Sequence, residues 1–257
     1  MCKKLCRAKQ KGAFLWMILL SVPLWGCTAA IQTVPSGPPV PSPVQVAEDG
    51  ERGWWRVSFH MGWPEDQERP AWHMDLCLAH MVLAPLIGHY EASLVLYRFH
   101  RRAVRDREGH RFSFIFYATP ETARQVFEDI EADKNVEAMI AHDKVVEVVF
   151  DETSGSKDLR VEDTSDPKWS PAVRKSWPYY IMGASRMWLQ LIDEVTAEHP
   201  DASKPRKWPE AEDFYRSVDK AVNELWQKEG RHAFLHHLNA LFGYESLVVY
   251  EKRFMTF

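Results

Sequence analysis

The sequence predicts an α+β protein with a ferredoxin-like β-α-β-β-α-β half over residues 54–152, followed by a mostly helical half with a closing strand over residues 153–257. Short segments of alternating apolar residues are interleaved with two helical patterns in the first half. Residues 152–168 are polar and acidic, and tryptophan–proline pairs typical of helix starts follow them. The hydrophobic content of 46% is that of a chain with a packed core, and the two halves are compatible with one continuous domain.

Four strands are expected in the first half. Val57 and Phe59 fall on one face of the first strand, over residues 55–61, because side chains alternate along a strand. The other strands are expected over residues 93–101, 110–118 and 144–151. The charged segment with Gly109 is typical of a hairpin loop between the second and third strands.

Two helices are expected between these strands. The first covers residues 71–90, where Gly88 is placed to end it. The second begins at Thr119-Pro120-Glu121, a capping residue followed by proline and an acid, and reaches about Ala132.

The second half is expected to hold three helices and one strand. Trp177-Pro178 and Trp208-Pro209 each read as a helix start. The helices are expected over residues 177–198, 208–229 and 231–242, and the strand over residues 245–254.

One stretch of sequence is echoed in the chain. Residues 86–97 and 241–250 each combine a helix end, a glycine and a strand-like segment. Two similar helix-to-strand junctions explain the echo more simply than a duplicated half does.

The first 26 residues have the layout of a secretory signal peptide. Five basic residues and no acidic one precede an apolar run, Ala13 to Trp25, that is too short to span a bilayer comfortably. The run ends in Leu24-Trp25-Gly26-Cys27, which resembles the lipobox of bacterial lipoproteins. The resemblance implies cleavage before Cys27, a diacylglycerol on its thiol and acylation of the new amino group. Thr28 is not the aspartate that favours inner-membrane retention in that family, so we expect the outer membrane, facing the periplasm.

Cleavage would change both the charge and the thiol inventory. It removes five of the 32 basic residues and none of the 36 acidic ones, leaving a net charge of about −9, so nucleic acid is not an expected partner. With Cys27 acylated, Cys77 is the single remaining thiol, which excludes an internal disulfide and favours a buried position.

The mature chain is expected to be anchored to the membrane and not to cross it. Its strongest apolar run, Leu76 to Ile87, is shorter than a bilayer-spanning helix and contains His80 and Pro85. Residues 27–53 combine the lipidated cysteine with a proline-rich tether that would hold the folded part away from the lipid headgroups.

An arginine-rich hairpin is the first candidate binding site. Six arginines and two acids lie between Arg98 and Arg111. A strand would place Arg98, His100 and Arg102 on one face, and guanidinium groups bind carboxylates and phosphates through paired hydrogen bonds. The candidate contacts for an anion or a partner protein are Arg98, His100, Arg101, Arg102 and Arg105. The alternatives are a solvated hairpin or internal pairing with the acidic segment 119–166.

A second candidate site lies on the first helix. His73, Cys77 and His80 are spaced so that one helical face would carry all three. Imidazole and thiolate could bind zinc or form a Cys–His nucleophile pair, whereas ordinary core packing is the simpler interpretation.

Two weaker signals remain. His232, His236 and Asn239, with His237 beside them, could chelate a metal or form the polar face of a helix. Tryptophans could stack on sugars, or could simply pack at helix starts and in the core; those concerned are Trp63, Trp169, Trp177, Trp188 and Trp208.

These observations favour a lipid-anchored, non-catalytic protein of the cell envelope that binds a partner protein or an anionic envelope component. The alternatives are a periplasmic enzyme with a His/Cys site, with zinc as its possible metal, and a glycan-binding protein. The sequence contains no glycine-rich phosphate loop, Gly-x-Ser-x-Gly motif or Cys-x-x-Cys motif.

Overall fold

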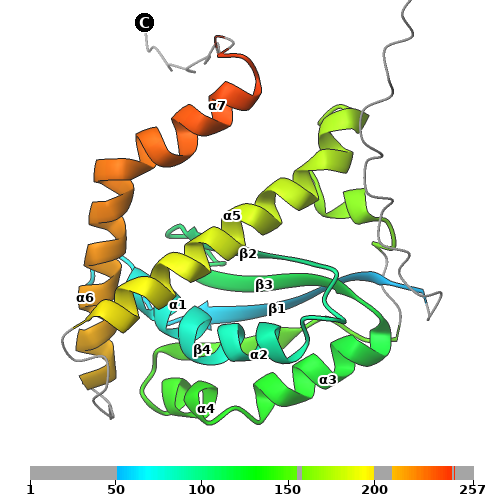
Figure 1. The fold of residues 1–257 in the computed structure, drawn as a ribbon. Coiled ribbons are helices and arrows are strands. Elements are labelled where there is room, and N and C mark those ends of the chain that lie inside the picture. Colours follow the sequence, from blue (N-terminus) through cyan, green and yellow to red (C-terminus); the bar gives the residue numbers. More distant parts are fainter. Residues whose placement is uncertain (1–50, 155–157, 200–209, 245, 247–257) are drawn as a thin grey trace, which may run out of the picture. The chain divides into compact units, whose positions relative to one another are not determined.

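The computed structural model describes residues 51–154, 158–199, 210–244 and 246. The expected signal peptide, Cys27 and most of the tether lie outside these residues, as does nearly all of the strand expected over residues 245–254. Within the described part, the predicted mixed α+β class is confirmed (Figure 1).

Four antiparallel strands form one sheet in the order β2-β3-β1-β4. They are β1 (Gly53–Met61), β2 (Leu96–Ala103), β3 (His110–Ala118) and β4 (Val145–Phe150). Both β1 and β2 run antiparallel to β3 between them, so they are parallel to each other and need a crossing connection. The alternating pattern places Trp55, Val57 and Phe59 in the core, where at most 1% of each is exposed.

The first connection is one continuous helical run. It consists of α1 (Trp72–Leu78), a π-helical segment η1 (Ala79–Leu83) and α2 (Ala84–His89). The run ends at His89, one residue beyond Gly88, which stays helical and is not the terminating residue that we predicted. Residues His73 to Ala79 are all buried because the run packs between the sheet and α6 (Glu210–Leu225).

Two helices connect β3 to β4 where one was predicted. Thr119 caps α3 (Pro120–Glu131), because its hydroxyl accepts a hydrogen bond of 3.2 Å from the Thr122 backbone amide. The additional helix, α4 (Lys134–Ala141), is capped in the same way by the Asp133 carboxylate. It buries only Val136 and Met139, which is too short an apolar pattern to be recognised from sequence.

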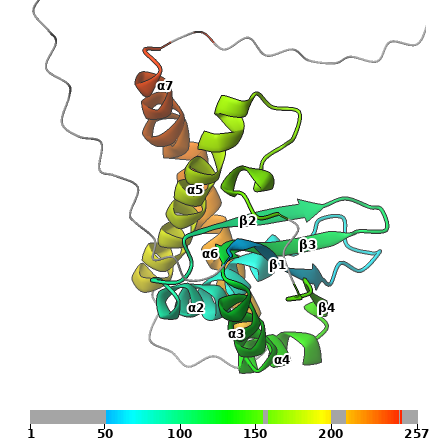
Figure 2. The same ribbon diagram turned by 90° about the vertical axis from the view of Figure 1, so that its right-hand side faces the viewer.

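The long helix α5 (Pro171–Glu198) starts before the predicted position. Pro171 is its first residue, so Trp177-Pro178 lies inside the helix and does not open it. Part of α5 packs beside β2 (Figures 1 and 2), where the Phe99 backbone amide donates a hydrogen bond of 3.1 Å to the Ser185 hydroxyl. The helix thereby protects part of the exposed edge of β2.

The last helical part runs without the predicted break at residue 230. The helix α6 continues as a π-helical segment η3 (Trp226–His236) and then α7 (His237–Leu241). Gly230 remains helical, and a β-carbon at this position would lie 2.5 Å from the Trp226 ring. Gly243 follows with a φ of +71°, so of the two echoed glycines only this one ends a helix. In the described residues, no helix has the length and hydropathy required to cross a bilayer.

Candidate functional site

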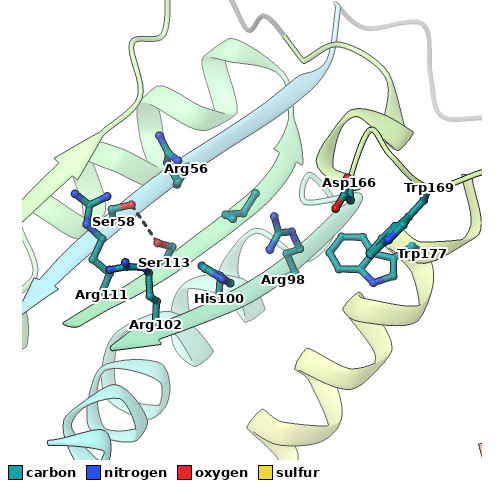
Figure 3. Close-up of a pocket in the computed structure, with 11 residues that line it drawn as sticks. Arg56, Ser58, Arg98, His100, Arg102, Arg111, Ser113, Asp166, Trp169 and Trp177 are labelled. Carbon is teal, nitrogen blue, oxygen red and sulfur yellow. Dashed lines mark hydrogen bonds between the residues drawn. The ribbon is translucent and has the colours of Figure 1, made fainter. Parts of the chain in front are cut away.

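The sheet face opposite α1 and α3 carries a cavity of about 490 Å³ (Figure 3). Its walls come from three strands, from the loop before α5 and from α5 itself. The lining residues are Arg56, Ser58, Arg98, His100, Arg102, Arg111, Ser113, Ile115, Asp166, Trp169 and Trp177.

The strand register arranges the floor in three rows that run across β1, β3 and β2. The first row is Arg56, Ile115 and Arg98; the second is Ser58, Ser113 and His100; the third is His60, Arg111 and Arg102. Strands lie about 4.8 Å apart, so the backbones of the first row's two arginines are separated by roughly 10 Å. The basic residues therefore surround a small polar centre.

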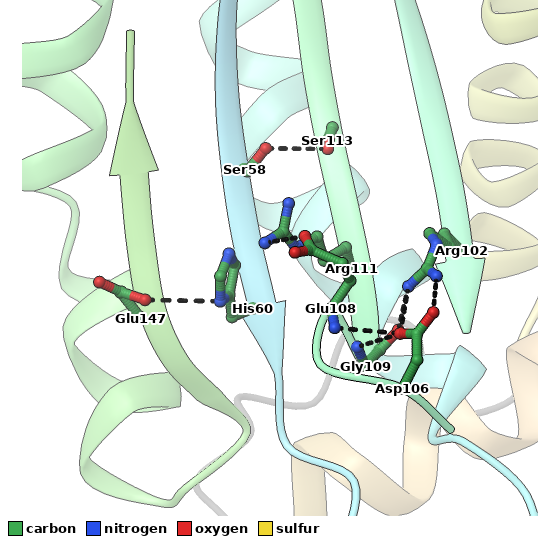
Figure 4. Close-up of polar contacts among 9 residues, drawn as sticks. All are labelled: Ser58, His60, Arg102, Asp106, Glu108, Gly109, Arg111, Ser113 and Glu147. Carbon is green, nitrogen blue, oxygen red and sulfur yellow. Dashed lines mark hydrogen bonds and ion pairs between the residues drawn. The ribbon is translucent and has the colours of Figure 1, made fainter. Parts of the chain in front are cut away.

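Acids of the hairpin loop neutralise the third row. Arg102 pairs with Asp106 and Arg111 pairs with Glu108 (Figure 4). His60 contacts Glu147 at 3.4 Å. Internal pairing thus explains the charges of this row. Most of the acidic partners come from the hairpin loop, and the segment 119–166 contributes only Glu147 to the row.

The first row is less completely paired. Arg56 contacts Asp151 at 3.4 Å, in an exposed pair that contributes little to stability. Arg98 donates to the Thr164 hydroxyl at 2.9 Å and lies over the Trp177 ring, 5.2 Å from its centre. Within the described part of the chain, Arg98 forms no ion pair with a carboxylate. Burial, followed by the positive charge of Arg56, lowers the pKa of Arg98 to about 10.

A smaller cavity of about 220 Å³ lies on the other side of Arg98 and contains acids. Two of its three acids pair with other arginines: Asp151 contacts Arg56, and Asp163 contacts Arg160 at 2.9 Å. Arg98 lies between the two cavities, and no carboxylate of the described residues forms an ion pair with its guanidinium.

Polar groups of the second row complete the floor. The hydroxyls of Ser58 and Ser113 lie 3.1 Å apart and are buried. Loss of surrounding water, followed by the charges of Arg98 and Arg102, lowers the pKa of His100. The buried Nε of Arg111 has no hydrogen-bond partner in the described residues, so it is a further donor at this face.

Two of the five predicted binding residues lie elsewhere. Arg101 points to the helical side of the sheet, where its Nε donates to Asp75 at 2.8 Å. Its guanidinium lies 4.8 Å from the centre of the Trp72 ring. Arg105 donates to backbone carbonyls, including that of Trp63 at 3.1 Å, and stacks on the Trp63 ring. Both arginines stabilise the fold, so the open site keeps Arg98, His100 and Arg102 of the predicted set.

The His/Cys candidate does not converge on one point. His73 Nε2 lies 3.4 Å from Glu212, and His80 Nδ1 lies 2.6 Å from the Tyr215 hydroxyl. The Cys77 sulfur lies 3.8 Å from that of Met81. Burial raises the pKa of the Cys77 thiol, which opposes the thiolate form that a nucleophile or a zinc ligand requires.

The second histidine candidate is an exposed ring cluster. The ring centres of His232, His236 and His237 lie 5.1–5.3 Å from one another, where η3 continues into α7. Among the described residues, no group of three His, Cys, Asp or Glu side chains has an arrangement that could hold a metal ion.

The tryptophans have separate environments. Trp188 packs against Phe99 and Phe112 in the core, as the simpler interpretation predicted. Trp169 and Trp177 form an edge-to-face pair with ring centres 5.4 Å apart at the cavity wall. Trp208 lies outside the described residues.

Sequence reasoning missed Arg56 and Ser58 of β1 and Asp166 of the loop before α5, although it singled out Trp169 of that loop. Arg56 and Ser58 alternate with buried apolar residues, which was the available signal for an opposite polar face. Asp166 gives no comparable signal, because its approach to the sheet depends on tertiary packing.

A comparison of the chain with known protein families, curated proteins and solved structures found no match.

Proposed function

We propose that this chain is a lipid-anchored, non-catalytic protein of the cell envelope that binds an anionic ligand or the acidic group of a partner on the open face of its sheet. The observation that carries the proposal is the guanidinium of Arg98 at a cavity of about 490 Å³, where no carboxylate of the described residues forms an ion pair with it. A partly buried charge is costly unless a counter-charge reaches it.

The neighbouring groups suit an anion. A guanidinium can offer paired N–H donors to a carboxylate or a phosphate. Arg56 lies across the first row from Arg98, and its exposed pair with Asp151 can open at little cost. An incoming anion can therefore be held from two sides.

The envelope location rests on the amino-terminal sequence. The basic start, the short apolar run and Leu24-Trp25-Gly26-Cys27 resemble a lipoprotein precursor. Two or three acyl chains at Cys27 would give stable anchoring, since each buried methylene contributes about 0.8 kcal/mol. We place the anchored protein at the outer membrane, facing the periplasm.

We further assign the sheet and its two crossing connections to the ferredoxin-like class. The order β2-β3-β1-β4, with helices between β1 and β2 and between β3 and β4, supports this assignment. The class itself implies no particular activity.

A binding measurement tests the proposed function. The full chain, purified in detergent, is titrated calorimetrically with inorganic phosphate. Arg98→Gln should weaken phosphate binding at least tenfold, or about 1.4 kcal/mol, because it removes the charge. Arg124→Gln is the matched control, since Arg124 is an exposed arginine on α3 that pairs with Glu121 and Glu128. Unchanged phosphate binding in Arg98→Gln would refute the proposal.

A further inference from the structure

We infer that the anion bound at Arg98 is carried by a sugar, so that the ligand is an acidic saccharide whose ring stacks on Trp169. This inference rests on the proposed function and specifies its ligand. It joins the arginine site and the tryptophan pair, which the sequence presented as separate signals.

The cavity is too large for a simple anion. A water molecule occupies about 30 Å³, whereas the cavity measures about 490 Å³. A lone phosphate or acetate at Arg98 would leave most of this space to solvent. The volume falls within the roughly 300–1,000 Å³ of small-molecule sites.

The wall beside Arg98 offers one accessible aromatic ring. Trp177 already carries the Arg98 guanidinium on its ring. Trp169 meets Trp177 edge to face and remains 39% exposed, so its indole is held in place but still reachable (Figure 3). A fixed indole next to a guanidinium can contact the apolar C–H face of a sugar while the arginine binds its acidic group.

Hydroxyl partners lie on the same cavity. Asp166 lines it beside Trp169 and can accept hydrogen bonds from sugar hydroxyls. The Ser58 and Ser113 hydroxyls lie in the floor and can act as donors or acceptors. The site therefore combines a cation, an aromatic ring and neutral or acidic hydrogen-bond acceptors. A bare anion would use the cation but not the ring or the acceptors.

The position of Trp169 is built into the chain. The Trp169 backbone amide donates to the Asp166 carbonyl at 3.1 Å, and the Lys168 amide donates to the Asp166 carboxylate at 2.8 Å. This turn fixes the acid and the indole relative to each other. Ser165, just before it, is tied to α5 through a hydrogen bond of 2.7 Å to the Arg174 carbonyl.

The test compares ligands that differ by one chemical feature. The full chain in detergent is titrated with glucose 1-phosphate, glucuronic acid, glucose, inorganic phosphate, acetate and AMP. We expect glucose 1-phosphate to bind at least about tenfold more tightly than inorganic phosphate, or glucuronic acid at least about tenfold more tightly than acetate. Whichever pair shows the larger difference identifies the acidic group as phosphate or carboxylate. Glucose alone should bind more weakly than both sugar acids.

Variants separate this inference from the proposed function. Trp169→Leu should remove the advantage of the sugar acid and leave inorganic phosphate binding unchanged. Trp226→Leu is the matched control, because Trp226 is similarly exposed at 45% but lies on η3. Arg98→Gln should weaken every anionic probe. A thermal melt of each variant confirms that it is folded.

Each outcome decides a specific point. Three results would overturn the saccharide inference alone. In the first, Trp169→Leu keeps the preference for the sugar acid. In the second, neither sugar acid binds more tightly than its simple anion; in the third, AMP binds more tightly than the sugar acids. Unchanged anion binding in Arg98→Gln would overturn the proposed function as well. Failure of the wild-type chain to bind any probe at millimolar concentration would overturn both.

Discussion

The Ser165 hydroxyl donates a hydrogen bond of 2.7 Å to the backbone carbonyl of Arg174. Arg174 lies four residues before Pro178, which has no N–H to donate to that carbonyl. The serine thus satisfies the acceptor that the proline leaves open inside α5. The same contact fixes the segment that places Asp166 and Trp169 at the cavity.

Ser165→Ala should lower the free energy of unfolding by about 1–3 kcal/mol, because it leaves the Arg174 carbonyl without a donor. Urea unfolding of the full chain in detergent measures the change. Ser176→Ala is the control, since that serine is exposed on the same helix and bonds only to carbonyls of its own turn. Equal unfolding midpoints for the two variants would contradict this role of Ser165.

The buried contact of Asp75 with Arg101 and His110 is the second testable feature. Asp75 is fully buried; Arg101 Nε lies 2.8 Å from one oxygen, and His110 Nε2 lies 3.0 Å from the other at an angle that makes no hydrogen bond. Asp75→Ala should cost about 3–5 kcal/mol of unfolding free energy, because it removes the buried carboxylate that Arg101 and the fully buried His110 contact.

The control for this prediction is Asp213→Ala. The Asp213 side chain is 81% exposed and lies 3.9 Å from Arg216, so its loss should change the unfolding free energy by less than about 1 kcal/mol. A similar, small effect of Asp75→Ala in urea unfolding would show that the buried carboxylate does not hold β2, β3 and α1 together.

Ligand binding should depend on the protonation of His100. The ring lies on β2 between Arg98 and Arg102, opposite Ser113 and near Arg111 on β3. Loss of water and the flanking positive charges lower its pKa in the free protein, and a bound anion would raise that pKa again. His100 thus has a higher pKa in the complex than in the free protein. Anion affinity should therefore increase as the pH falls from above the higher value towards the lower one.

Sulfate is the suitable probe for this pH dependence because it does not titrate near neutral pH. Calorimetry across the range in which histidine titrates should show tighter binding at lower pH, accompanied by proton uptake. His100→Gln should flatten the profile, whereas His142→Gln, on the exposed turn after α4, should not. A pH profile that His100→Gln leaves unchanged would remove His100 from the binding site.

The sequence predicted the sheet better than the helices around it. The period of two was clear in β1 and β2, because apolar and polar side chains alternate along each of these strands. The start of α5 was misplaced because Trp177-Pro178 has the appearance of a helix start, whereas the distant hydroxyl of Ser165 bonds the carbonyl that Pro178 leaves open within the helix. Such compensation from another segment leaves no local signal.

The candidate site was half predictable for the same reason. Alternation correctly grouped Arg98, His100 and Arg102 on one face. The side of the sheet on which the Arg101 guanidinium lies depends on Asp75, which is 26 residues away on a buried helix. An acid inside an almost wholly apolar helical run was a signal that a buried cation would be required there, but it did not identify which arginine.

Counting thiols tests the expected processing of the amino terminus. The unprocessed chain holds four cysteines, whereas cleavage before an acylated Cys27 removes Cys2 and Cys6 and blocks Cys27, leaving Cys77. Cys77 is fully buried and burial raises its pKa, so the native mature protein should react with no equivalent of a thiol reagent at neutral pH. After denaturation it should react with one, and Cys77→Ser should react with none.

The Cys27→Ser variant should be neither cleaved nor acylated, and its three remaining thiols should all react after denaturation. Four reactive thiols in the denatured wild-type chain would show that neither cleavage nor acylation occurs, and the assigned membrane anchor would then be wrong.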